Sequence, residues 1–158
     1  MNLPSFIASA TGQANLWKDL THSVPTLAAL AQLASNRLVN PASNETELSI
    51  EARTILSITR KRGIIELKSN NTEFESAQRM LAVYVEESVD THVMFRSRTE
   101  PEITVRFLDG FRQLCDAGLV MHQVGGEFSL TSKGFQQAKD IPSDEVSEVA
   151  ALGTVLSF

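Results

Sequence analysis

The stretch from Pro101 to Asp116 carries the side chains best suited to reading nucleic acid. Its apolar residues recur at helical spacing, which predicts a helix whose outward face carries Arg106, Arg112 and Gln113. Arginine and glutamine side chains can hydrogen-bond to base edges in a major groove. Three acids share that face: Glu102, Asp109 and Asp116. Because phosphates would repel these acids, base recognition would need cations nearby to offset the repulsion.

Two basic clusters could supply those cations. They are Arg60, Lys61 and Arg62 at the end of one expected helix, and Arg96 with Arg98 ahead of another. Cations in the last turn of a helix also complement its macrodipole, so the first cluster is expected to lie on a solvated face. The second cluster is expected to form ion pairs with neighbouring acids such as Glu100. Phosphate contact or partner binding is the alternative for both clusters.

Residues that could perform catalysis or bind a metal are few and scattered. The histidines, His22, His92 and His122, do not stand at metal-ligand spacing with one another or with Cys115. Cys115 borders the apolar stripe of its helix, which favours a buried hydrophobic role over a nucleophilic one. The glycine pair 125–126 lacks the Lys and Ser or Thr that a phosphate-binding loop needs. The sequence therefore predicts no enzyme, no metal site and no cofactor.

Composition predicts a soluble globular chain with a slightly acidic balance. The 158 residues are 42% hydrophobic, enough for one core, and the net charge is −5. Residues 1–48 contain 2 basic residues (Lys or Arg) and 3 acidic ones (Asp or Glu). Residues 49–140 contain 12 basic and 13 acidic residues, and residues 141–158 contain no basic and 3 acidic residues. This balance weighs against non-specific attraction to phosphate backbones. With one cysteine, no export signal and no apolar run that could span a bilayer, a cytoplasmic, membrane-free location is expected.

Local patterns predict a mainly helical chain with short strands. Helices are expected over 25–38, 50–62, 72–85, 101–116 and 131–139, and strands over 64–68, over 89–96 and in a hairpin around Gly125 and Gly126. Ser49 is expected to cap the second helix, whereas Thr72 with Glu75, and Thr99 with Glu102, should form capping boxes. Residues 83–85 also suit a strand, so 74–87 stays open between helix and partial strand.

Aromatic side chains are expected mostly in the core. Helix and strand periods place five of them on interior faces: Phe74, Phe107, Phe111, Phe128 and Phe135. Trp17 lies outside the main domain in an amphipathic arm, where it could anchor a partner or pack back on the domain. Apolar side chains in the tail 141–158 are numerous enough to dock on another surface.

The order helix, short strand, helix, helix and hairpin resembles that of winged helix-turn-helix domains. The string RFLDGFRQLCDAGLVMHQVGGEFSLTSKG, from Arg106 to Gly134, is similar to their third helix, its Gly-Leu-Val exit and the wing. The resemblance covers residues 49–140 and implies an α+β, mainly helical fold with a small antiparallel sheet. Residues 1–48 would then form an N-terminal helical arm and linker, and 141–158 an acidic and apolar tail. One departure is the insertion Ser88 to Pro101, which replaces a turn of about 3 or 4 residues.

Two functions are compatible with these expectations. The first is a non-enzymatic regulatory or protein-interaction module that self-associates, because the charge is balanced, the wing tip is acidic, and two apolar appendages could pack between subunits. The alternative is a DNA-binding transcriptional regulator that reads duplex DNA with the helix Pro101 to Asp116.

Overall fold

The computed structural model describes residues 24–41 and 47–158. Its helices are α3 (Val24–Val39), α4 (Ile50–Thr59), α5 (Ser76–Arg79), α6 (Pro101–Asp116), α7 (Ser132–Lys139) and α8 (Ser143–Ala150). Its strands are β1 (Ile64–Lys68), β2 (Ala82–Ser88), β3 (Thr91–Phe95), β4 (Val120–His122), β5 (Glu127–Leu130) and β6 (Thr154–Ser157). The strands form one antiparallel sheet in the order β4-β5-β1-β2-β3-β6. The expected α+β class is confirmed, with a larger sheet than the sequence predicts.

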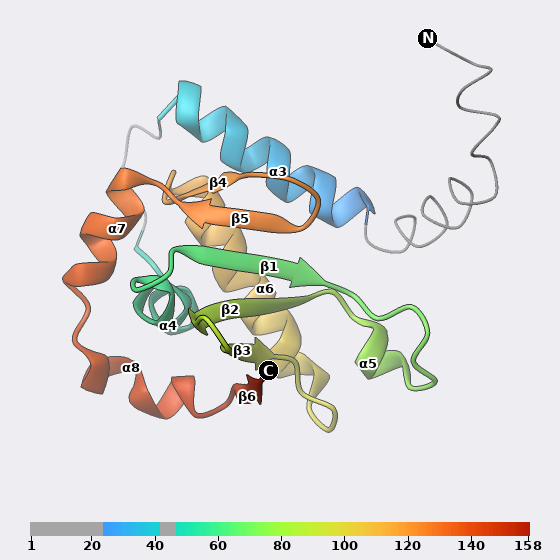
Figure 1. Cartoon of the computed structure of the whole chain (residues 1–158). Helices are drawn as coiled ribbons and strands as arrows, with labels where there is room; N and C mark the ends of the chain where they lie inside the picture. Colours follow the sequence, from blue (N-terminus) through green and yellow to red (C-terminus); the bar gives the residue numbers. More distant parts are fainter. Residues whose placement is uncertain (1–23, 42–46) are drawn as a thin grey trace, which may run out of the picture.

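The sheet is covered by helices on one face. Figure 1 shows α4 and α6 behind the strands, and no helix of residues 24–41 and 47–158 covers the opposite face of β1, β2 and β3. Between these layers lies a core of fully buried side chains, in which Phe95 stacks on Phe107 at a ring-centroid distance of 4.0 Å. Phe111 and Phe128 meet edge to face at 4.8 Å. Burial of these rings, together with the aliphatic side chains of the same core, holds the sheet and the helices together.

Several elements follow directly from local sequence. The helix α6 has the predicted bounds, and β1 has the predicted residues. The hydroxyl of Ser49 accepts a hydrogen bond from the Ala52 amide (3.2 Å), so the predicted N-cap of α4 is confirmed. The predicted hairpin forms between β4 and β5, and Gly125 adopts a φ of +56° in its turn.

Of the two alternatives left open for residues 74–87, the helix is wrong and the partial strand is confirmed. Only the four residues of α5 are helical there, without a side-chain cap, and residues 82–88 form β2. Val83 and Val85 are fully buried, because pairing with β1 and β3 directs them into the core. Phe74, expected inside, is 95% exposed. Tertiary pairing thus overrides a weak local helical pattern.

Two smaller expectations also need correction. The capping box of Thr99 with Glu102 does not form, because Glu100 is the N-cap of α6 and makes no side-chain cap hydrogen bond. Instead, the Thr104 hydroxyl accepts from the Ser97 amide (2.9 Å) just ahead of the helix. Phe135 is 36% exposed, so its expected burial is only partial.

The segments that flank residues 49–140 share their hydrophobic core. Leu30 and Ala34 of α3 are buried with it, as are Ile141 and Val146 near and within α8. The last strand, β6, pairs with β3 and ends the sheet. The predicted docking of apolar side chains in the tail is therefore confirmed, through both α8 and β6.

The buried guanidinium of Arg96 ties the segment after β3 to the sheet. Arg96 is 5% exposed. Its Nη1 donates to the carbonyl oxygens of Gln78 (2.7 Å) and Met80, and its Nη2 donates to the carbonyl of Lys68 (3.0 Å) and the hydroxyl of Tyr84 (3.3 Å). The ion pair expected with Glu100 is wrong, since backbone carbonyls are the partners of this side chain. These bonds hold the end of β1 and the residues of and after α5 against the residue that follows β3.

Replacing Arg96 by Met should lower the free energy of unfolding by about 3 kcal/mol, because the carbonyls lose a charged donor worth about 1.5–3 kcal/mol per hydrogen bond. Urea denaturation measures the change. Arg98→Met is the matched control, since Arg98 is an exposed neighbour whose ion pair with Glu75 contributes little. An equal effect of the two substitutions would contradict the role assigned to Arg96.

Candidate functional site

The outward face of α6 holds its polar side chains in internal pairs. Arg106 Nε lies 3.3 Å from Glu51 Oε1, and Arg112 Nε donates to Asp109 Oδ1 at 2.9 Å. Gln113 donates to Asp109 Oδ2 (3.2 Å), and its carbonyl oxygen accepts from the Ser49 amide (2.8 Å). The three side chains predicted to read bases are therefore already engaged with this chain's own groups.

The charges on this face compensate one another. The hydrogen bond from Arg112 holds the pKa of the Asp109 carboxyl below its ordinary value, so Asp109 stays ionised beside it. Farther along α6, Asp116 Oδ1 pairs with Arg37 Nη2 of α3 at 2.9 Å. A polyanion would have to break these pairs before it reached the arginines.

The second basic cluster is divided between interior and surface. Arg96 is buried, as described above, whereas Arg98 pairs with Glu75 at 2.6 Å. The hydrogen bond from Arg98 lowers the pKa of the Glu75 carboxyl. The predicted ion pair with an acid is thus confirmed for Arg98, with Glu75 in place of Glu100.

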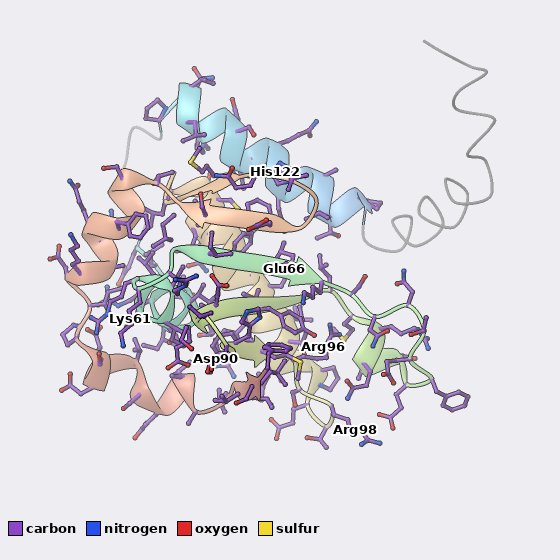
Figure 2. The ribbon with its side chains drawn as sticks, in the orientation of Figure 1. Lys61, Glu66, Asp90, Arg96, Arg98 and His122 are labelled. Atoms are coloured by element: carbon purple, nitrogen blue, oxygen red, sulfur yellow. The ribbon has the colours of Figure 1, made fainter. Side chains whose placement is uncertain are left out.

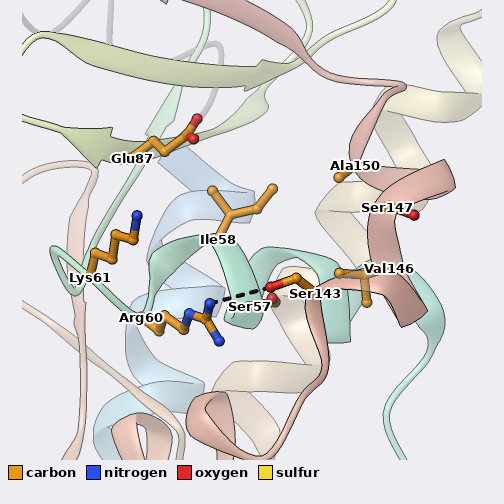
Figure 3. A pocket seen from close by; sticks show the side chains of 9 residues that line it. All are labelled: Ser57, Ile58, Arg60, Lys61, Glu87, Ser143, Val146, Ser147 and Ala150. Carbon is orange, nitrogen blue, oxygen red and sulfur yellow. Dashed lines mark hydrogen bonds between the residues drawn. The ribbon is translucent and has the colours of Figure 1, made fainter.

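The first cluster lies far from the second. Figure 2 shows Lys61 and Arg98 at opposite sides of the molecule, so the two clusters form no common cationic surface. Arg62 pairs with Glu86 across 3.4 Å, which removes it from the cluster. Arg60 and Lys61 line a pocket between α4 and α8 (Figure 3).

The hairpin tip packs against the sheet. The carbonyl of Gly126 accepts from the Leu67 amide of β1 at 2.8 Å, and a Cβ at residue 126 would lie 2.2 Å from the Leu67 carbonyl oxygen. The turn contains no Lys or Arg, and Glu127 begins the next strand. This tip therefore forms part of the packed domain and offers no cation to a phosphate.

The two edges of the sheet differ in protection. At one edge, β4 has only three residues, and α3 packs alongside it. At the other edge, β6 pairs with β3, and no further strand follows in the described chain. Short strands and covering helices are the usual protection of a sheet edge against pairing with another chain.

The hydrogen-bond alternation shows which backbone groups of β6 face outward. The Phe158 amide donates to the Asp90 carbonyl at 2.8 Å, and the register sets Ser157 opposite Thr91. Because antiparallel partners alternate between bonded and non-bonded pairs, the N–H and C=O groups of Val155 and Ser157 point away from β3. These groups are available to a further strand.

β6 and the residues next to it carry exposed apolar side chains and no charged side chain of their own. Val155 is 61% exposed and Phe158 is 76% exposed, while Leu152 just before the strand is 42% exposed. Residues 152–158 contain no charged side chain. The Phe158 ring contacts His92 edge to face at a centroid distance of 4.9 Å, which holds it on the open face of the sheet. Sequence reasoning recognised an apolar tail but missed this edge.

Sites of other kinds find little support in the described residues. Within 24–41 and 47–158, no group of three or more His, Cys, Asp and Glu side chains could hold a metal ion. Over the same residues, no helix has the length and apolar character needed to cross a membrane. Trp17 and His22 lie outside the described residues.

Comparison of the chain with protein-family models, curated proteins and solved structures finds no significant match.

The thiol of Cys115 should be unreactive in the folded chain. Burial raises the pKa of this thiol from the ordinary 9.0 to about 12, so the thiol stays protonated. The stability that the protonated thiol contributes to the folded chain is complete below pH 9 and is lost as the pH rises through 12. We expect an aromatic disulfide reagent to react with Cys115 only after denaturation in urea. Reaction at the same rate in native and denatured chain would show that the thiol is accessible.

Proposed function

We propose that this chain is a non-enzymatic protein-interaction module that self-associates by pairing β6 with the β6 of a second copy. The observation that carries the proposal is the β6 edge, which no further strand of the described residues pairs with and whose outward backbone groups belong to Val155 and Ser157. A second copy supplies an identical uncharged strand. Two-fold antiparallel pairing of these strands satisfies both sets of backbone groups at once and extends the sheet across two subunits.

Exposed side chains favour the same partner. The exposed side chains of Val155 and Phe158 lie beside the β6 edge. Pairing with the same side chains of a second copy removes apolar surface from water. No charge of β6 opposes its own copy across the axis. Because β6 has only four residues, the interface belongs to the small, reversible class that buries less than about 1,200 Å².

The scaffold proposed for this module is a divergent winged helix over residues 49–140. Its support is the order α4, β1, α6 and the β4–β5 hairpin, with β5 pairing to β1. The resemblance is incomplete, because β2 and β3 stand where a second helix is expected. In this proposal, β2 and β3 extend the sheet from the β4–β5 hairpin and β1 to β6, and the β6 edge then serves as the surface for self-association.

The internal ion pairs favour this proposal over recognition of duplex DNA. Arg106 and Arg112 are each engaged with an acid of this chain, and Arg96 is buried. We expect the full chain to leave a mixed-sequence DNA duplex unshifted on a native gel at low salt. A retained duplex whose binding weakens steeply with salt, and is lost in the double variant R106A/R112A, would instead support the DNA-binding alternative.

Replacing Ser157 by Pro tests self-association directly. The Ser157 amide points away from β3, so proline removes an outward donor while it leaves the β3–β6 bonds in place. We expect sedimentation velocity to show a concentration-dependent dimer for the original chain and a monomer for Ser157→Pro, with unchanged circular dichroism.

Thr154→Ser is the control, because it changes an edge side chain and leaves every backbone donor in place, and it should dimerise normally. A monomeric original chain at all concentrations would contradict the proposal. So would a dimer that Ser157→Pro leaves intact.

A further inference from the structure

A pocket of about 340 Å³ lies between the C-terminal half of α4 and the helix α8. Figure 3 shows Arg60 and Lys61 on one side of it, α8 with Ser143 and Val146 on the other, and Glu87 of β2 above. This volume is near the lower end of the range for small-molecule sites, about 300–1,000 Å³. The pocket is therefore large enough for a small organic molecule and too large for a bare ion alone.

The cations of this pocket retain free donors. Arg60 Nη2 donates to the Ser143 hydroxyl at 3.3 Å, and this is its one side-chain hydrogen bond within the described chain. Lys61 has neither an ion pair nor a side-chain hydrogen bond with any described residue. The contrast with Arg62, Arg98, Arg106 and Arg112 is direct, because each of those side chains pairs with an acid. The pocket therefore holds two cations, Arg60 and Lys61, against one carboxylate, that of Glu87.

The Ser57 hydroxyl is a further donor in the same pocket. Ser57 lines the pocket, and its hydroxyl makes no hydrogen bond within the described residues. Among the described residues, Glu51 Oε2 is the one buried side-chain N or O atom without a partner, so the Ser57 hydroxyl is open to solvent and can bond to an acceptor in the pocket. Neighbouring Thr54, in contrast, donates its hydroxyl to the Ile50 carbonyl at 2.7 Å.

The remaining lining residues define the rest of the ligand. Ile58 of α4, with Val146 and Ala150 of α8, forms the apolar wall of the pocket. Glu87 lines the same pocket and has no ion pair among the described residues, so its carboxylate can accept hydrogen bonds. The pocket therefore offers donors for an anionic group, an apolar wall for carbon atoms, and an acceptor for hydroxyl groups.

We propose that this pocket binds a small organic phosphate, with its phosphoryl group held by Arg60, Lys61 and the hydroxyls of Ser57 and Ser143. A phosphate dianion carries enough acceptor oxygens for these donors, and bonds between charged partners are about twice as strong as neutral ones. Its carbon portion lies along the apolar wall, and its hydroxyl groups donate to Glu87.

Titration of the full chain with ribose 5-phosphate, followed by calorimetry and by backbone amide shifts, tests this site. We expect saturable binding with shifts centred on residues 57–61 and 143–147. The double variant R60Q/K61Q should weaken binding at least about tenfold, since it removes both charged donors. Ser57→Ala should weaken binding several-fold without loss of fold, because alanine is well tolerated within a helix.

Lys68→Gln is the matched control, since it removes one positive charge from an exposed position on the far face of β1 and should leave affinity unchanged. Ribose should not bind, and inorganic phosphate should bind at least about tenfold more weakly than the ester. Absence of saturable binding by ribose 5-phosphate would overturn the proposal, as would equal weakening by Lys68→Gln. If inorganic phosphate bound as tightly as the ester, the contact proposed between the carbon portion of the ligand and the apolar wall would be overturned.

Discussion

Backbone hydrogen bonding between β3 and β6 is the interaction from which the proposed function follows. It fixes the last strand on the sheet, and its alternation decides that Val155 and Ser157 present their backbone groups outward. A strand in this position cannot satisfy those groups within the described chain. The opposite edge, in contrast, lies beside α3. The asymmetry between the two edges makes one of them the natural interface.

Electrostatics limits the alternatives in the same molecule. Arg106, Arg112 and Arg98 are paired with Glu51, Asp109 and Glu75, and Arg96 is buried among carbonyl oxygens. Exposed pairs of this kind add little to stability, but each sets a carboxylate beside its arginine. Arg60 and Lys61 have no acidic partner of this kind and line the pocket between α4 and α8. The proposed β6 interface and the proposed phosphate pocket therefore use different elements. They are neighbours in the chain, because α8 lines the pocket and is followed directly by β6.

Local sequence predicted the parts of the fold that local interactions decide. The spacing of apolar residues predicted the bounds of α6. Ser49 predicted the start of α4, and the glycine pair 125–126 predicted the β4–β5 hairpin. The helix expected over 72–85 failed because Val83 and Val85 are placed by strands distant in sequence. The β6 edge was missed for the same reason, since its register depends on residues 91–94. The partners of Arg96 are carbonyl oxygens, which no side-chain pattern reveals.

Hydrogen exchange at the amides of Val155 and Ser157, measured at increasing protein concentration, tests the central claim most directly. Both amides face outward in a single copy, so they should exchange rapidly in dilute solution and become protected as copies pair. The Phe158 amide, already bonded to Asp90, should be less sensitive to concentration. Rapid exchange of Val155 and Ser157 at every concentration would contradict an interface formed by this strand.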